Sequence, residues 1–409
     1  MTSDQIVLAI GTVVVLAVAC QVVAPKLRLP ALVLLLPVGF LVGALLPSVD
    51  PVQIFGDAFT PMVNLTVAVI LFHGGLELME SPVDRSDRRI VHRLVWLGSP
   101  ITWVVAAVAA YFLLDLPAPI AVLLGAILIV SGPTVVGPLL NFVRPQARIR
   151  RLLAWEGTLV DPVGALTAVI VFQGVAASGE ESVGQAVRTF ALSMLIGGLC
   201  ALLGLALIWA GLRLTAGNRM LGTEVLLAAV IGAAALADAL ADDAGLVTGV
   251  AMGMAAPFLV REGLSEVKPF FDTIVNLAIG ILFISISALV DPASIGAVLV
   301  GSLILVAILV LVVRPLVAWL MTAGTTFTRD ERLFIGWMAP RGIVAAATAA
   351  SFSTELVSRQ IPGGDKLLPI VFLVIAGTVV IYSVTAVPVA GLLGVRAEEQ
   401  HADLSPVDR

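Results

Sequence analysis

Apolar runs of bilayer-spanning length follow one another along nearly the whole chain, separated by short polar segments. A helix rises about 1.5 Å per residue, so about 20 apolar residues cross the hydrocarbon core of a membrane. The pattern therefore predicts an all-α polytopic membrane protein with about 13 transmembrane helices. The predicted spans are residues 4–24, 29–47, 53–77, 90–114, 118–141, 151–173, 184–212, 220–240, 243–260, 268–290, 294–318, 331–353 and 367–394.

The composition excludes a soluble protein with a single membrane anchor. Hydrophobic residues make up 59% of the 409 residues and charged residues only 12%, whereas soluble proteins contain about 25% charged residues. The mean hydropathy is +1.09. The sequence contains neither a phosphate-binding loop nor a Cys/His metal cluster. We therefore expect a protein that is not an enzyme and that uses no cofactor, nucleotide or nucleic acid.

The basic residues alternate between the two sides of the predicted spans. With the N-terminus outside, the outer loops hold only Arg188, Arg359 and Lys366, and Arg341 falls inside a span. The inner loops hold 19 of the 23 basic residues, namely Lys26, Arg28, Arg85, Arg88, Arg89, Arg93, Arg144, Arg148, Arg150, Arg151, Arg213, Arg219, Arg261, Lys268, Arg314, Arg329, Arg332, Arg396 and Arg409. Because cytoplasmic loops are enriched in basic residues, we predict a multi-pass protein of the bacterial inner membrane. Its C-terminal tail, residues 395–409, would be cytoplasmic.

Two carboxylates lie within the sixth predicted span. Residues 155–162 read WEGTLVDP, so Glu156 and Asp161 interrupt an apolar run. If this span enters the membrane near Arg151, Asp161 lies roughly 15 Å deep, close to the midplane. A charge at that depth costs at least about 2.5 kcal/mol, so an ionisable group there normally faces a cavity, a partner or a transported ion.

Two other spans are interrupted at matching places. The fifth span carries Ser-Gly-Pro at residues 131–133, and the twelfth carries Pro-Arg-Gly at residues 340–342. Interrupted helices at corresponding positions of two halves indicate a transporter built from inverted repeats, although two ordinary proline kinks remain an alternative. The predicted membrane domain, residues 1–394, then comprises a first repeat at about 4–173, a linking helix at 184–212 and a second repeat at about 220–394.

At these stretches the chain resembles the monovalent cation/proton antiporter superfamily, in its NhaP-like (sodium/proton exchanger) branch. That branch has Glu-Ser-x-x-Asn-Asp in its sixth helix, where residues 156–161 read EGTLVD here. It has Thr-Asp-Pro in one broken helix and Gly-Pro-Arg-Gly in the other, where this chain has SGP and APRG. Residues 71–78, LFHGGLEL, are similar to its third-helix Phe-x-x-Gly-Leu-Glu-Leu. The resemblance implies an NhaA-like antiporter fold with two broken, crossing helices, and a homodimer.

The resemblance assigns Asp161 as the group that binds a transported monovalent cation or a proton in turn. The family's Asn and Asp ligands are replaced here by Val160 and Gly132. Their substitutes are the hydroxyls of Ser131, Thr134 and Thr158 together with freed backbone carbonyls. The same hydroxyls could equally well satisfy those carbonyls in the broken helices.

A second group of polar residues is assigned to supporting roles. Glu156 and Arg341 both reach mid-depth, and we expect them to form a structural ion pair, as in the family. The alternative makes Glu156 a second proton carrier. His73 and Glu77 lie at i and i+4 on one helix face. They are candidates for an accessory role in cation access or pH sensing, with a purely structural pair as the alternative.

Taken together, we expect a secondary active antiporter that exchanges Na⁺ or K⁺ for a proton. The fifth, sixth and twelfth spans would form a core that moves against a scaffold and exposes Asp161 to each side alternately. A single titratable ligand favours electroneutral exchange. The alternatives are a symporter for an organic anion, bound at the helix N-termini of the two breaks, and a gated channel or sensor.

Overall fold

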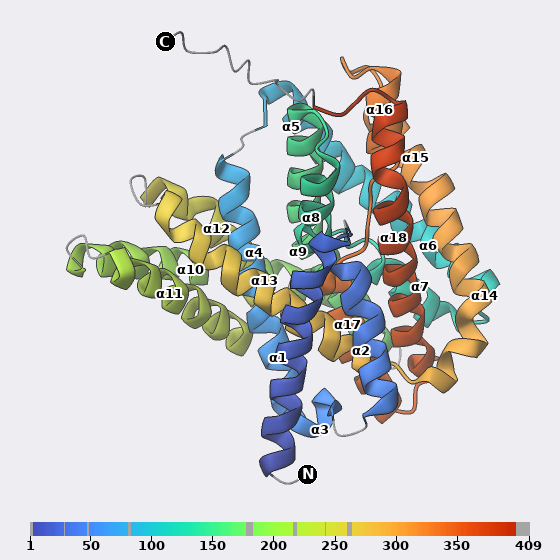
Figure 1. Cartoon of the computed structure of the whole chain (residues 1–409), viewed down its shortest axis with the longest axis horizontal. Helices are drawn as coiled ribbons and strands as arrows, with labels where there is room; N and C mark the ends of the chain where they lie inside the picture. Colours follow the sequence, from blue (N-terminus) through green and yellow to red (C-terminus); the bar gives the residue numbers. More distant parts are fainter. Residues whose placement is uncertain are drawn as a thin grey trace, which may run out of the picture.

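The computed structural model describes residues 3–27, 29–46, 49–80, 83–176, 183–215, 219–241, 243–259 and 264–397 (Figure 1). Within these ranges the chain is helical and contains no strand. The helices are α1 (Ser3–Lys26), α2 (Leu32–Leu45), α3 (Pro51–Phe55), α4 (Phe59–Glu80), α5 (Arg85–Arg93), α6 (Ser99–Leu113), α7 (Ala118–Ile127), α8 (Pro133–Val143), α9 (Ala147–Ala176), α10 (Val183–Leu214), α11 (Arg219–Leu240), α12 (Ala244–Leu259), α13 (Leu264–Ala288), α14 (Pro292–Ile308), α15 (Arg314–Met321), α16 (Arg329–Ile335), α17 (Ile343–Ser358) and α18 (Gly364–Leu392).

The helices follow the 13 predicted spans in order, and some spans contain more than one helix. In the described ranges, nine helical stretches are long and apolar enough to cross a membrane, and four shorter apolar helices accompany them. Two of the long stretches are built from several elements. A π-helical turn, η3 (Leu94–Gly98), joins α5 to α6, and another, η4 (Leu309–Val313), joins α14 to α15. The fold class predicted from the apolar pattern is thereby confirmed.

Both predicted interruptions are real breaks in the helices. The fifth span divides into α7 and α8, and the twelfth divides into α16 and α17. Gly132 is the N-cap of α8 and Pro133 follows at its first position. Gly342 is the N-cap of α17. Proline lacks a backbone donor and is favoured at the first position of a helix, so a Gly-Pro pair ends one helix and starts another.

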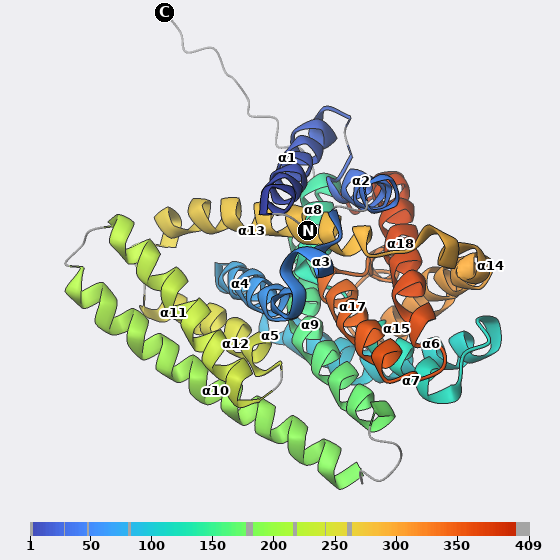
Figure 2. The ribbon, with the colours of Figure 1, turned by 90° about the horizontal axis from the view of Figure 1, so that it is seen from below.

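The helices form two groups. Figure 2 shows α10–α12 on one side of the molecule and α6, α7 and α14 on the other, with α2 beside α18. In the scaffold group, which comprises α1, α2, α4 and α10–α13, α12 packs on α4, α10 covers α11 and α12, and α13 packs on α2. In the core group, which comprises α5–α9 and α14–α18, α7 packs on α6 and α9, and α18 packs on α14 and α17. The two groups meet where α4 and α10 touch α9, where α4 and α13 touch α17, and where α2 touches α18.

The two ends of the membrane domain lie at opposite faces of the molecule. Figure 1 shows the start of α1 at one end and the end of α18 at the other, as an odd number of crossings requires. After α18, the chain pairs with the loop between α8 and α9. Gln146 donates its N–H to the carbonyl of Val395, and Ala397 donates to that of Arg144. Of the predicted tail, residues 398–409 lie outside the described residues.

Candidate functional site

Asp161 is fully buried at the middle of α9. The exposed fraction of the residue is 0%, and neither carboxylate oxygen has a hydrogen-bond partner among the described residues. A buried polar group without a partner is costly, and a buried charge is far more costly. An unsatisfied carboxylate at such a position therefore calls for a proton or a bound cation.

The carboxyl group of Asp161 lies directly against the break between α7 and α8. A Cβ atom placed on Gly132 would come within 2.8 Å of its Oδ1 and 2.9 Å of its Cγ, and closer still to Oδ2. Only glycine leaves this room. Because Gly132 is the N-cap of α8, the carboxylate also faces the end of a helix that carries partial positive charge.

Two cavities approach Asp161 from opposite directions along α9. The larger, about 740 Å³, lies between the two helix groups and is lined on α9 by Ala165 and Val169. The smaller, about 20 Å³, is lined on α9 by Glu156 and Val160. Asp161 stands between these two sets of lining residues. The cavity toward the end of α9 is thus much the larger of the two, and Asp161 itself lines neither.

The predicted hydroxyl ligands lie close to this carboxylate in the chain, with different surroundings. Ser131 is buried in the break and lines the small cavity. Thr158 is buried one turn before Asp161 on α9 and donates its hydroxyl hydrogen to the carbonyl of Ala154 at 3.0 Å. The hydroxyl oxygen of Thr158 can still accept a hydrogen bond. Thr134 lies in the first turn of α8, but its side chain is outside the part of the chain that the structure describes.

The expected Glu156–Arg341 ion pair is corrected by the structure. Glu156 pairs with Arg314, whose Nη2 lies 2.8 Å from Oε2 and whose Nη1 contacts Oε1. Both side chains are buried, with exposed fractions of 8% for Arg314 and 7% for Glu156. The Nε of Arg314 donates to the carbonyl of Ile335 at 3.0 Å. Arg314 was expected in an inner loop, but it starts α15 within a continuous helical stretch.

Arg341 has a different partner from the one expected. Its Nη1 donates to the carbonyl of Ile129 at 3.0 Å, with the carbonyl of Val130 at 3.5 Å. These carbonyls are freed where α7 ends, and a cation is favourable at a helix C-terminus. The backbone N–H of Arg341 lies 3.4 Å from the hydroxyl of Thr378 on α18. The guanidinium thus joins the break of the twelfth span to the break of the fifth.

Sequence reasoning missed Arg314 and Thr378 as parts of this site. The signal for Arg314 was present, because apolar residues continue for two turns beyond it, to Met321. A basic residue inside an apolar run is expected to have a buried acidic partner rather than a place in a loop. Nothing comparable distinguishes Thr378 from the other hydroxyl residues in apolar helices.

The two candidate accessory residues lie elsewhere. His73 and Glu77 are on α4 in the scaffold group, and neither lines the large or the small cavity. Their neighbour is Asp272 on α13, whose carboxylate lies 3.0 Å from the Nε2 of His73. These residues are therefore not part of the site around Asp161.

Comparisons with known proteins agree with the fold and identify a family. Residues 12–391 match the family described as "Sodium/hydrogen exchanger, transmembrane". The Na(+)/H(+) antiporter NhaH of Halobacillus dabanensis is 23% identical over 414 residues, covering 93% of this chain and 96% of that protein. Na(+)/H(+) antiporter 1 of Methanocaldococcus jannaschii is 24% identical over 369 residues, covering 85% and 83%.

The fold also matches a solved structure. The sodium proton antiporter MjNhaP1 from Methanocaldococcus jannaschii at pH 8 superposes with a TM-score of 0.80 at 22% sequence identity. The superposition covers 95% of this chain and 100% of that chain. At this identity the likeness shows the shared fold.

Replacing Arg314 by Met should leave the Glu156 carboxylate buried without its partner. We expect the free energy of unfolding to fall by about 3–5 kcal/mol, measured by thermal unfolding of the detergent-solubilised protein. Adding Glu156→Gln to the same chain should restore part of the loss. The control is Arg359→Met, which breaks the exposed Arg359–Glu355 pair and should cost less than about 1 kcal/mol. Equal losses in the two single variants would contradict the assignment.

Proposed function

The chain belongs to the sodium/hydrogen exchanger family, and from this membership we propose how its site performs exchange. It is a membrane-spanning secondary transporter that exchanges Na⁺ for protons, and it is not an enzyme. We propose that Asp161 is the group that holds either a proton or the cation. Loading at one face and release at the other would then couple the two fluxes in opposite directions.

The observation that carries this proposal is the isolation of the Asp161 carboxylate between two cavities. The group is fully buried and has no hydrogen-bond partner among the described residues, so neither a neighbouring base nor a donor competes for its charge. Because only one of the cavities is large, access is from one side at a time. A shift of the core group against the scaffold group, which meet at α9 and α17, would close one cavity and open the other.

We assign the remaining cation ligands to oxygen atoms around the same break. Ser131 and Thr158 supply hydroxyl oxygens near Asp161, with Thr134 as a third candidate at the start of α8. Pro162 has no N–H to donate, so the carbonyl of Thr158 lacks its usual helical partner and adds a backbone oxygen. Hydroxyl, carbonyl and carboxylate oxygens are the donors that hard cations prefer. Membership of the family supports sodium as the cation, and transport of potassium has no such support.

The two buried arginines hold the site in place in this proposal rather than bind the cation. Arg314 neutralises Glu156, which precedes Asp161 on α9. Arg341 donates a hydrogen bond to a carbonyl at the end of α7. A partnered Glu156 has no reason to carry a second proton. The alternative of organic-anion symport has no support, because the buried group that faces the break is itself an acid and would repel an anion.

We propose that the transporter lies in the cell membrane of a bacterium, with its N-terminus outside and its C-terminus in the cytoplasm. The support is the distribution of basic residues among the loops. Arg314, now found buried, leaves that distribution otherwise unchanged. We also propose a homodimer, on the resemblance to the antiporter superfamily alone.

An Asp161→Asn variant should lose sodium-driven proton movement, because asparagine can neither titrate nor neutralise a cation. The measurement is a pH-sensitive dye in proteoliposomes with a sodium gradient. The matched control is Asp115→Asn, which changes an exposed acid in the loop between α6 and α7, and should transport like the unmodified protein. Exchange retained by Asp161→Asn would refute the site.

A Gly132→Ala variant should also lose most of its exchange, because the added methyl group takes the space of the Asp161 carboxylate. Gly132 has a φ of −82°, which alanine adopts freely, so the effect is steric rather than conformational. The control is Gly137→Ala on the same helix, where a Cβ atom meets nothing within 4 Å. Equal transport rates in the two variants would show that the break does not position the carboxylate.

Exchange through one carboxyl group should move one proton for each sodium ion and carry no net charge. A potential of 100 mV acts on each transferred charge with about 2.3 kcal/mol, so an electrogenic exchanger would respond strongly. We expect the exchange rate in proteoliposomes to be unchanged when potassium and valinomycin set the membrane potential. A rate that follows the potential would exclude the one-for-one stoichiometry.

A further inference from the structure

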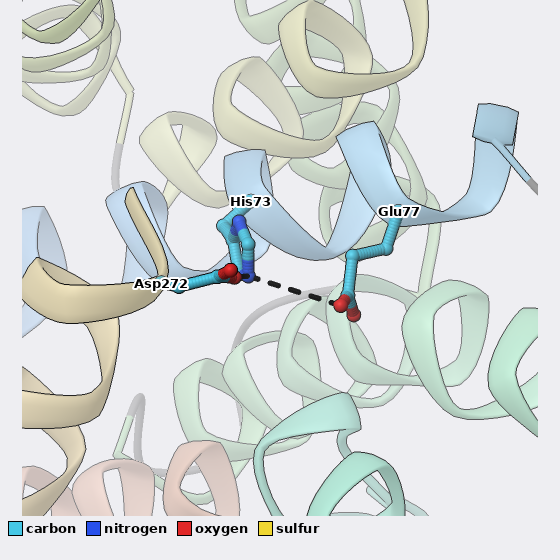
Figure 3. Close-up of side chains that lie close together, drawn as sticks. All are labelled: His73, Glu77 and Asp272. Carbon is cyan, nitrogen blue, oxygen red and sulfur yellow. Dashed lines mark ion pairs between the residues drawn. The ribbon is translucent and has the colours of Figure 1, made fainter. Parts of the chain in front are cut away.

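We propose that His73, Glu77 and Asp272 form a binding site for one divalent transition-metal ion of the zinc type, separate from the transport site. The three side chains come together from α4 and α13 in the scaffold group (Figure 3). One ligand atom of each, the imidazole nitrogen and two carboxylate oxygens, lies within 4.8 Å of the others.

The spacing fits a metal ion placed between the three atoms. The Nε2 of His73 lies 3.0 Å from Oδ1 of Asp272 and 4.0 Å from Oε1 of Glu77. Zinc bonds to histidine nitrogen and carboxylate oxygen are about 2.1 Å, so tetrahedral ligand atoms stand about 3.4 Å apart. The carboxylate side chains of Glu77 and Asp272 are 49% and 43% exposed. They therefore have the freedom to close the remaining difference.

The helix packing holds the histidine and the aspartate in register. Phe72 and Phe271, the residues just before His73 and Asp272, are fully buried and their ring centroids lie 5.2 Å apart. On its other side α4 packs tightly on α12. A Cβ atom on Gly253 would come within 2.9 Å of the backbone of Phe72. Rigid helices that fix ligands before the ion arrives reduce the cost of binding.

The imidazole of His73 presents its Nε2 atom to the two carboxylates. His73 is 8% exposed, and its Nδ1 is buried without a hydrogen-bond partner among the described residues. The ring therefore interacts with its polar neighbours only through Nε2, the atom that faces both carboxylates (Figure 3). A nitrogen flanked by two carboxylate oxygens is a ligand set that suits zinc or manganese. Magnesium and calcium prefer oxygen ligands alone.

The charge of the cluster attracts a cation. Glu77 and Asp272 bring two carboxylates together, and a bound cation would offset their negative charge. Lys268 lies one turn before Asp272 on α13 and adds a positive charge nearby. Lys268 offsets part of this negative charge without any metal. A binding experiment shows whether the cluster also holds a divalent ion.

The test is a calorimetric titration of the full-length, tag-free protein with Zn²⁺, after removal of metals with a chelator. We expect one Zn²⁺ bound per chain, and Mg²⁺ bound much more weakly. His73→Gln, Glu77→Gln and Asp272→Asn should each lower the Zn²⁺ affinity by about 10-fold to 100-fold, the range seen when even indirect support of a metal site is lost. Bound Zn²⁺ should also raise the unfolding temperature of the unmodified protein and not that of the variants.

The matched control is His92→Gln, which removes an exposed histidine of α5 outside the cluster and should bind Zn²⁺ like the unmodified protein. Absence of Zn²⁺ binding by the unmodified protein would overturn the proposal, as would unchanged affinity in the His73→Gln variant. The unfolding temperature of each variant without Zn²⁺ shows whether it folds. If His73→Gln does not fold, Glu77→Gln decides the question, because its side chain is half exposed.

Discussion

Placing a charge inside a membrane costs free energy, and the buried ionisable groups of this protein offset that cost in different ways. Glu156 and Arg314 neutralise each other through a bidentate contact, and Arg341 is held by carbonyls that the α7 break sets free. Asp161 has no such partner in the described part of the chain. An acid that the protein itself leaves uncompensated is available to a mobile ion, and in the proposed function this difference separates Asp161 from the residues that support it.

The break in the fifth span contributes both to the binding of Arg341 and to the surroundings of Asp161. Ending α7 early frees the carbonyls that hold Arg341, and starting α8 at Gly132 brings a helix N-terminus and a side-chain-free backbone against Asp161. A continuous fifth helix would supply neither. The Gly-Pro sequence at the break therefore shapes the surroundings of Asp161 as well as the local backbone.

The sequence was sufficient for the fold because membrane spans depend on the length of apolar runs, which can be counted directly. The two breaks were also predictable, since Pro and Gly side by side act locally. The partner of Glu156 was not predictable, because Arg314 and Arg341 both lie within apolar runs and only packing decides between them. The expected Arg341 was chosen for its motif, whereas Arg314 starts α15 and its side chain reaches Glu156 on α9. Likewise, His73 and Glu77 were visible as a helix-face pair, but Asp272, nearly 200 residues away, could be added only by the fold.

The short pairing between residues 395–397 and the loop from Arg144 to Gln146 has a mechanical consequence. That loop leads from the broken fifth span directly into the helix that bears Asp161. A load on the chain beyond residue 397 would therefore act on the loop between α8 and α9 in the core group rather than on the scaffold group. The C-terminal segment is thereby connected, through this loop, both to the broken fifth span and to the helix that carries Asp161.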